Sequence, residues 1–201
     1  MLEAEEIASC VSEIEEDFQS SPGLILSEDD AKCLLFGKIQ LLLAGRGQSR
    51  GVTAQESVFA SPLHMEIKFL DQNGALSIRP DITVMDTTSL SLVHSREGLN
   101  VNRKGFVFYG SATAIEIKFC KARRGIDWRL TSSIQRDCEK LIEIRHRLYP
   151  PEERATFKAV VVVFNRSSRV CQAFNDLQTQ YMGNAPVRIV YASANFNAAA
   201  A

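Results

Sequence analysis

Hydrophobic residues recur along the first part of the chain with the spacing of an α-helix. Residues 2–18 place Ile7, Val11, Ile14 and Phe18 on one helical stripe. A break at "SSPG" follows, and a second helix is predicted to begin after Ser27, with Asp30 as its capping-box partner. The chain therefore opens with two helices, of which the first (1–25) is expected to pack on a core domain (26–195).

The pattern then changes to the alternation of a β-hairpin. Two alternating runs flank Asn73-Gly74, the strongest short-range signal for a two-residue turn. Facing residues then have numbers that add to 147, and this register separates an apolar face from a polar one. The apolar face pairs Met65, Ile67 and Phe69 with Ile82, Pro80 and Ile78; the polar face pairs His64, Glu66 and Lys68 with Thr83, Asp81 and Arg79. A bulge at Pro80 would shift the register by one, because proline cannot donate to the ladder.

The rest of the chain predicts a strand, a crossover helix and further α/β elements. A polar insertion (87–110, with a possible strand at 106–109) precedes a third strand at 114–119. A helix is predicted over 133–148, with Asp137 and Lys140 as a surface pair. The apolar run "FKAVVVVFN" is typical of a strand buried on both faces after a crossover. A helix near 169–182 and a strand at 187–191 complete the order.

Composition limits the classes of protein that fit. The 201 residues are 45% hydrophobic and carry a formal net charge of −1, so nucleic acid would need a local basic patch. Five scattered cysteines indicate neither a disulfide framework nor a zinc site. The acidic start has no apolar leader and no segment has the length of a membrane span, so we expect a cytoplasmic protein without a membrane partner. The last residues (196–201) have the character of a tail added for expression.

Acidic residues gather where the predicted strands meet. In the 147 register Glu66 and Asp81 are direct cross-strand neighbours, and the third strand adds Glu116 beside Asp81 with Lys118 on the same face. Like charges in such a position need a cation or a shared proton. Hard cations such as Mg²⁺ seek oxygen clusters of this kind.

Pro80-Asp81 followed by Glu116-Ile117-Lys118 resembles the motif of the PD-(D/E)xK nuclease superfamily, the restriction-endonuclease-like fold. The resemblance covers about residues 27–191. It implies an α/β fold with a mixed central sheet, in which a three-strand antiparallel meander is joined by a crossover helix to a parallel strand. Glu-Ile-Lys-Phe occurs twice, at 66–69 and 116–119, and the resemblance assigns the catalytic role to the second copy. The span from Asp81 to Glu116 is longer than in compact versions of the motif.

The resemblance also implies roles for individual residues. Asp81, Glu116 and the backbone carbonyl of Ile117 would hold Mg²⁺ or Mn²⁺, and Lys118 would orient a water or stabilise charge in the transition state. Further candidate ligands, which leave one or two metals open, are Glu66, Glu28 and His64. The competing interpretation of each of these residues is an ordinary solvated position on a strand or in a first helical turn.

A basic segment follows the third strand and is a candidate for phosphate-backbone contacts. Its residues are Lys121, Arg123, Arg124 and Arg129. Trp128 lies among them and is interpreted as an anchor of the loop rather than a base-stacking residue. The sequence as a whole predicts a metal-dependent nuclease acting on DNA more readily than on RNA, as a homodimer or in a larger complex if both strands are cut. The alternative is a nuclease-fold protein without catalysis that binds nucleic acid or protein.

Overall fold

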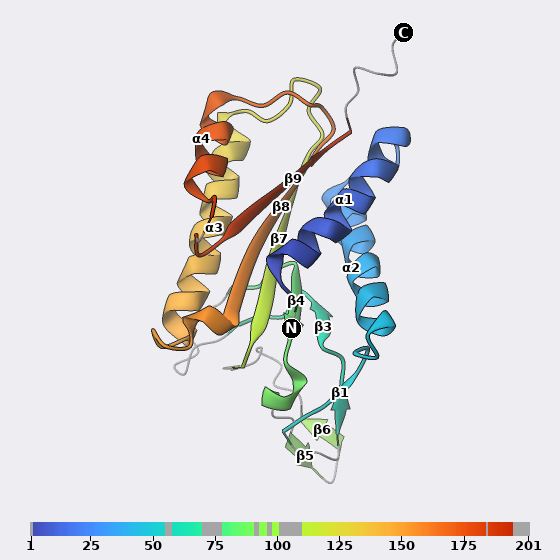
Figure 1. Ribbon diagram of the computed structural model, residues 1–201, viewed down its shortest axis with the longest axis vertical. Coiled ribbons are helices and arrows are strands. Elements are labelled where there is room, and N and C mark those ends of the chain that lie inside the picture. The colour runs from blue at the N-terminus through green and yellow to red at the C-terminus, as the bar shows by residue number, and fades with distance from the viewer. Residues whose placement is uncertain are drawn as a thin grey trace.

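The chain forms an α/β fold with a five-stranded mixed sheet between helices, as the computed structural model shows (Figure 1). The structure describes residues 2–54, 58–69, 78–90, 93–95, 98–100, 110–183 and 185–194. The predicted turn at 73–74 and the possible strand at 106–109 lie outside these residues.

Within the described residues, four helices and five strands make up the main body. The helices are α1 (Ala4–Ser20), α2 (Glu28–Gly45), α3 (Trp128–Leu148) and α4 (Gln172–Gln180). The sheet contains β3 (Leu63–Met65), β4 (Ile82–Met85), β7 (Ala112–Cys120), β8 (Phe157–Asn165) and β9 (Arg188–Ser193), in the order β3-β4-β7-β8-β9. Smaller elements are the pair β1 (Gly51–Val52) and β2 (Phe59–Ala60), the pair β5 (Val93–Ser95) and β6 (Gly98–Asn100), and the 3₁₀ turns η1 (Thr87–Ser89) and η2 (Arg154–Thr156).

The order of strand directions agrees with the sequence prediction. β3, β4 and β7 pair antiparallel, while β8 runs parallel to β7 and β9 parallel to β8. Parallel neighbours need a crossover, and α3 and α4 supply the two crossovers. The meander followed by a parallel strand, flanked by helices, is therefore confirmed at the level of the α/β class.

The predicted hairpin register is correct, but the predicted faces are not. Met65 faces Ile82, and Phe69 forms a bridge with Ile78, so the register is the same on both sides of Pro80. However, Glu66 has a φ of 53°, in the left-handed region, and this breaks the alternation of the strand. Met65 is consequently exposed, and the apolar residues on either side of the break contribute to different cores.

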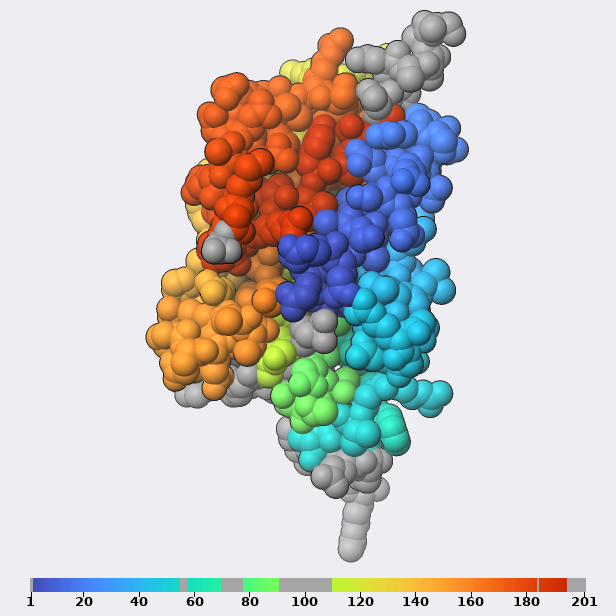
Figure 2. Space-filling model, in the orientation of Figure 1, coloured from blue at the N-terminus to red at the C-terminus, as the bar shows by residue number. Residues whose placement is uncertain are grey.

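Each face of the sheet has its own hydrophobic core. Residues of α1 and α2 pack on one face, with Phe18 in edge contact with the ring of Phe164. Residues of α3 and α4 pack on the other, where Phe69 meets Phe157. Helix α1 belongs to the first of these cores and lies along β9; in Figure 2 its blue atoms adjoin the red atoms of the C-terminal part of the chain. Across the described residues, no helix is long and apolar enough to span a membrane.

Helix α3 begins five residues earlier than predicted. Asp127 caps it, because its carboxylate accepts hydrogen bonds from the backbone N–H groups of Arg129 and Leu130. Trp128 and Arg129 are therefore helical residues rather than loop residues. The cap of α2 agrees with the prediction, since Ser27 and Asp30 accept from each other's backbone N–H.

Replacing two glycines by alanine is predicted to change the free energy of unfolding in opposite directions. Gly125 has a φ of 82°, and a Cβ there would collide with the backbone carbonyl of Arg169. Gly37 lies inside α2 with open space around its Cβ position. We expect Gly125→Ala to lower the free energy of unfolding by at least about 1–2 kcal/mol and Gly37→Ala to raise it by about 0.5–1 kcal/mol. Urea unfolding of both variants measures the two shifts, and equal shifts would contradict the described loop geometry.

Candidate functional site

The candidate site lies where β7 continues past the N-terminal end of its antiparallel neighbour β4. The β4–β7 ladder stops at the pair Ile82–Ile115, while β7 runs on to Cys120. The backbone N–H of Ile117 therefore loses its strand partner, and the carboxylate of Asp81 accepts its hydrogen bond at 2.7 Å. A buried N–H needs such an acceptor. Asp81 is thereby fixed at the open edge of β7.

Lys32, a residue of α2, forms a salt bridge with Asp81. Its Nζ lies 2.8 Å from Asp81 Oδ1, and both side chains are about nine-tenths buried. The same Nζ lies 3.8 Å from Glu66 and 3.7 Å from Asp29. Burial alone would lower the pKa of Lys32, but its contacts with Asp81 raise it above the usual value. Lys32 was not predicted from the sequence, because a polar residue in a helix gives no signal of which strand residue it meets.

Glu116 is a buried carboxyl on β7 that, among the described residues, has no ion-pair partner close enough to neutralise it. It is only 6% exposed, and the nearby charges of Asp81 and Asp137 disfavour its ionised form. Burial, with these two carboxylates, raises its pKa to about 8. At neutral pH Glu116 therefore holds a proton in the metal-free protein.

Lys118 points to a second buried acid, Asp137 on α3. The two side chains form an ion pair with Nζ 3.0 Å from Asp137 Oδ2, and Glu28 lies 3.9 Å from the same Nζ. The ammonium also donates to the carbonyl of Ile117 at 3.3 Å. Burial alone would lower the pKa of Lys118, but Asp137 and its neighbours raise it. Lys118 is therefore a charged donor here and cannot accept a proton.

The predicted pairing of Asp137 with Lys140 is correct, but the predicted surface position is wrong. Lys140 Nζ lies 2.7 Å from Asp137 Oδ1, while Asp137 itself is only 3% exposed. Asp137 occupies the same helical stripe as Ile134, Cys138 and Leu141, which all face the core. That spacing was the sequence signal for a buried acid.

The structure places the three further candidate ligands at the periphery. Glu66 forms ion pairs with Lys32 and Arg79, and Glu28 forms one with Lys118. The ring of His64 hydrogen-bonds the carbonyl of Ser61 at 2.7 Å, and burial lowers its pKa. Within the described part of the chain, no three acidic, histidine or cysteine side chains are grouped to hold a metal ion. Of the predicted metal donors, Asp81 lies near enough to Glu116 to influence its pKa, and the Ile117 carbonyl accepts a hydrogen bond from Lys118.

The predicted basic residues lie on exposed surface at the end of β7. Lys121, Arg123, Arg124 and Arg129 are all exposed, and Arg124 pairs with Asp127 at 3.2 Å. Trp128 is the first residue of α3 and is 64% exposed, so the structure gives no support to its interpretation as an anchor of the loop.

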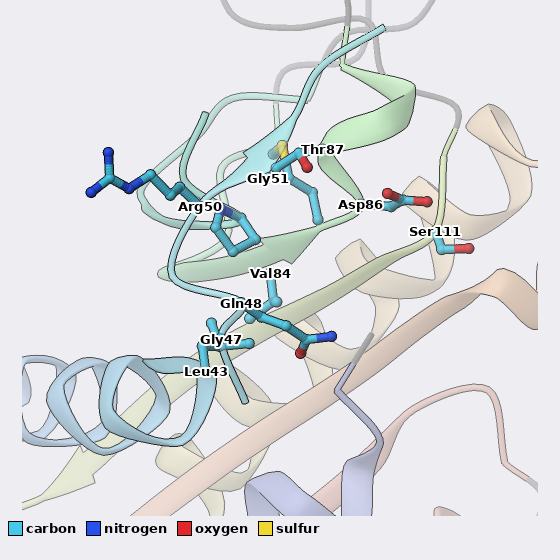
Figure 3. A pocket seen from close by; sticks show the side chains of 11 residues that line it. Leu43, Gly47, Gln48, Arg50, Gly51, Val84, Asp86, Thr87 and Ser111 are labelled. Atoms are coloured by element: carbon cyan, nitrogen blue, oxygen red, sulfur yellow. The ribbon is translucent and has the colours of Figure 1, made fainter. Parts of the chain in front are cut away.

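A separate pocket of about 430 Å³ lies at the other end of the sheet, beside β1 and the end of α2 (Figure 3). Asp86 is the one acid among its described lining residues, and its carboxylate already accepts from the N–H and hydroxyl of Thr88. Figure 3 shows Arg50 extending away from Asp86 and Ser111. These groups do not converge, so this pocket is not the candidate site.

The raised pKa of Glu116 predicts a pH-dependent stability. A carboxyl whose pKa is higher in the folded state stabilises the protein at low pH, and this stability is lost as pH rises from about 4.5 to about 8. In a chelator, the wild type should lose on the order of 5 kcal/mol relative to Glu116→Gln over that range, or roughly 10–20 °C in Tm.

Thermal unfolding at a series of pH values checks this difference. Glu16→Gln, an exposed position on α1, removes the same formal charge and is the matched control. It should leave the wild-type pH dependence in place. Parallel curves for the wild type and Glu116→Gln would show that the carboxyl ionises normally in the fold.

Comparisons of the chain with protein-family models, with curated proteins and with solved structures found no match. The function is therefore argued from the chemistry of the site. That chemistry consists of two buried carboxyl groups and a backbone carbonyl at an open strand edge, with a charged lysine from each of α2 and β7.

Proposed function

We propose that the protein is a metal-dependent nuclease that hydrolyses phosphodiester bonds, in DNA before RNA, with a restriction-endonuclease-like fold. One observation carries the proposal. Asp81 is 35 or more residues from Glu116, Ile117 and Lys118 along the chain, yet the four residues meet at the open edge of β7. The order of meander, crossover helix and parallel strand also supports that fold.

The donor set fits a hard divalent ion such as Mg²⁺ or Mn²⁺. Burial and, after it, the nearby charge of Asp81 raise the pKa of Glu116 to about 8, so a cation bound here would take the place of the proton on this carboxyl. These two carboxylates and the Ile117 carbonyl would hold the ion, with water completing the oxygen shell. When bound, the ion would lower the pKa of a coordinated water and neutralise charge on the scissile phosphate.

The chain's own residues would do the rest. Lys118 is held charged by Asp137 at 3.0 Å, so it would donate to the phosphate or to the attacking water rather than abstract a proton. Asp137, which Lys140 also pairs with, fixes the position of that ammonium from α3. The Ile117 N–H fixes the carboxylate of Asp81. Both Asp81 and Lys118 are thus oriented by a second buried contact.

A second candidate function is a nuclease-fold protein that binds nucleic acid or protein without cutting. The salt bridge of Lys32 with Asp81 favours this candidate, because an ammonium already neutralises the acid that a metal would need. The absence of a three-acid cluster among the described residues favours it as well. Cleavage assays separate the two candidates directly.

We expect Lys118→Met to lower the rate of cleavage by about 100- to 1,000-fold, because a preorganised charge at the transition state is lost. The assay offers plasmid, single-stranded DNA and RNA with Mg²⁺ or Mn²⁺. Methionine keeps the approximate length of the side chain, and Lys140 still pairs with Asp137 in the variant.

Lys68→Met, in the first Glu-Ile-Lys-Phe copy, is the matched control and should retain wild-type cleavage. Equal activity of wild type and Lys118→Met would remove Lys118 from the chemistry. A folded wild type that cuts no substrate with either ion would favour the binding function.

A further inference from the structure

We infer that the surface around Trp128 binds a single-stranded segment of nucleic acid, with one unpaired base stacked on the indole. The inference rests on the proposed function for the class of its ligand and goes beyond it in naming the strand state. Trp128 opens α3 and is 64% exposed, although an indole is one of the largest apolar groups that folding can bury. The guanidinium of Arg129 lies 5.4 Å from the centre of its ring.

Two basic loops meet beside this tryptophan. The β7–α3 loop (121–127) carries Lys121, Arg123 and Arg124, and the β8–α4 loop (166–171) carries Arg166 and Arg169. Both loops lie at the same end of the sheet, at the top of Figure 1. The second loop was not singled out by the sequence, because its arginines are distant from the motif along the chain.

Backbone hydrogen bonds join the two loops into one surface. Ile126 N–H donates to the carbonyl of Arg169 at 3.0 Å, and Cys171 N–H donates back to the carbonyl of Ile126 at 3.0 Å. The side-chain amide of Asn165 also donates to the Arg169 carbonyl at 3.0 Å. Gly125 permits this close approach, since any Cβ there would collide with the same carbonyl. The basic side chains are therefore presented on a fixed backbone.

The charge of this surface is opposite to that of a phosphate backbone. The chain as a whole has a net charge of −1, but residues 121–136 and 166–171 together hold seven basic side chains and one acidic side chain. That acid, Asp127, caps α3 and pairs with Arg124, and Glu139 follows one turn further along the helix. The exposed side chains of this surface include Lys121, Arg123, Arg124, Trp128, Arg129 and Arg169.

A shallow depression of about 460 Å³ continues from the tryptophan along α3. Ser132, Gln135, Arg136 and Glu139 line it together with Trp128 and Arg129, and they offer both hydrogen-bond donors and acceptors. An aromatic face beside such groups suits an extruded base, whereas the bases of an intact duplex are already stacked on each other.

The surface is connected to the candidate site through β7. Lys118 lies two residues before Cys120, where the strand ends and the β7–α3 loop follows. Asp137 lies nine residues after Trp128 on α3, which corresponds to about 14 Å along the helix axis and the opposite side of the helix. A strand that enters the site would therefore follow the basic loops and reach the indole a few nucleotides away from the scissile bond.

The chain contains one tryptophan, so its fluorescence reports on Trp128 alone. The experiment titrates the full chain in chelator with a thymidine oligonucleotide of about 12 nucleotides, within the range of single-strand site sizes. Stacking should quench the emission in a saturable way, and the matching duplex should bind more weakly and without that quenching. Anisotropy of the labelled oligonucleotide should show affinity reduced by about 5- to 150-fold in Trp128→Ala, with partial recovery in Trp128→Phe.

Met182→Ala, at another exposed apolar side chain, is the matched control and should bind as the wild type does. Unchanged tryptophan emission at saturation, or equal affinities of wild type and Trp128→Ala, would overturn the inference. Equal quenching by duplex would overturn the single-strand assignment. Sedimentation that shows self-association lost in Trp128→Ala, without oligonucleotide binding, would overturn it as well and make this face a contact between copies of the chain.

The outcome is separable from that of the nuclease proposal. Quenching without cleavage would retain the binding surface and reject the nuclease. Cleavage that depends on Lys118 but not on Trp128 would retain the nuclease and reject the surface. If both hold, Trp128→Ala should raise KM more than it lowers kcat, because the indole is remote from the reacting bond.

Discussion

The hydrogen bond from the Ile117 N–H to the carboxylate of Asp81 is the constraint on which the site depends. β7 is buried along most of its length and pairs with β8 from end to end. Its ladder with β4, however, stops at Ile82, the first residue of β4. An unpaired N–H at that depth would cost about 1–3 kcal/mol. Asp81, which directly precedes β4, supplies the acceptor. The end of the β4–β7 ladder therefore places a carboxylate beside the middle of β7.

That arrangement brings Asp81, Glu116 and Asp137 near one another, and the neighbouring elements offset their charges unequally. Lys32 from α2 neutralises Asp81, and Lys118 with Lys140 neutralises Asp137. Glu116 has no such partner among the described residues and holds its proton, because its pKa is raised to about 8. Three neighbouring acids are thus stabilised by ion pairs or protonation. The proposed cation would take the place of the proton on Glu116.

The sequence predicted the scaffold well, because alternation and helical spacing report directly on burial. The register of the hairpin, the strand at 157–165 and the Ser27 cap are all as expected. The prediction of one apolar and one polar face for the hairpin was wrong, since a left-handed residue at Glu66 breaks an alternation that the sequence shows as continuous. The start of α3 was placed too late, because the capping role of Asp127 was not recognised.

The site was predictable only where its residues lie on adjacent strands. Asp81, Glu116 and Lys118 follow from register, whereas Lys32 and Asp137 depend on how helices pack over the sheet. Asp137 carried a signal in its apolar stripe, and Lys32 carried none. The exposure of Trp128 was likewise a matter of helix orientation, which the basic composition of its neighbourhood did not reveal.

The most direct test of the cation site is the melting temperature of the metal-free protein titrated with Mg²⁺ or Mn²⁺. Binding to the folded state alone raises stability by about 2.7 kcal/mol at a hundredfold excess over Kd. We predict a saturable rise in Tm for the wild type that is largely lost in Asp81→Asn and unchanged in Glu16→Gln. No rise with either ion, from protein that is folded at the start, would contradict the proposed site.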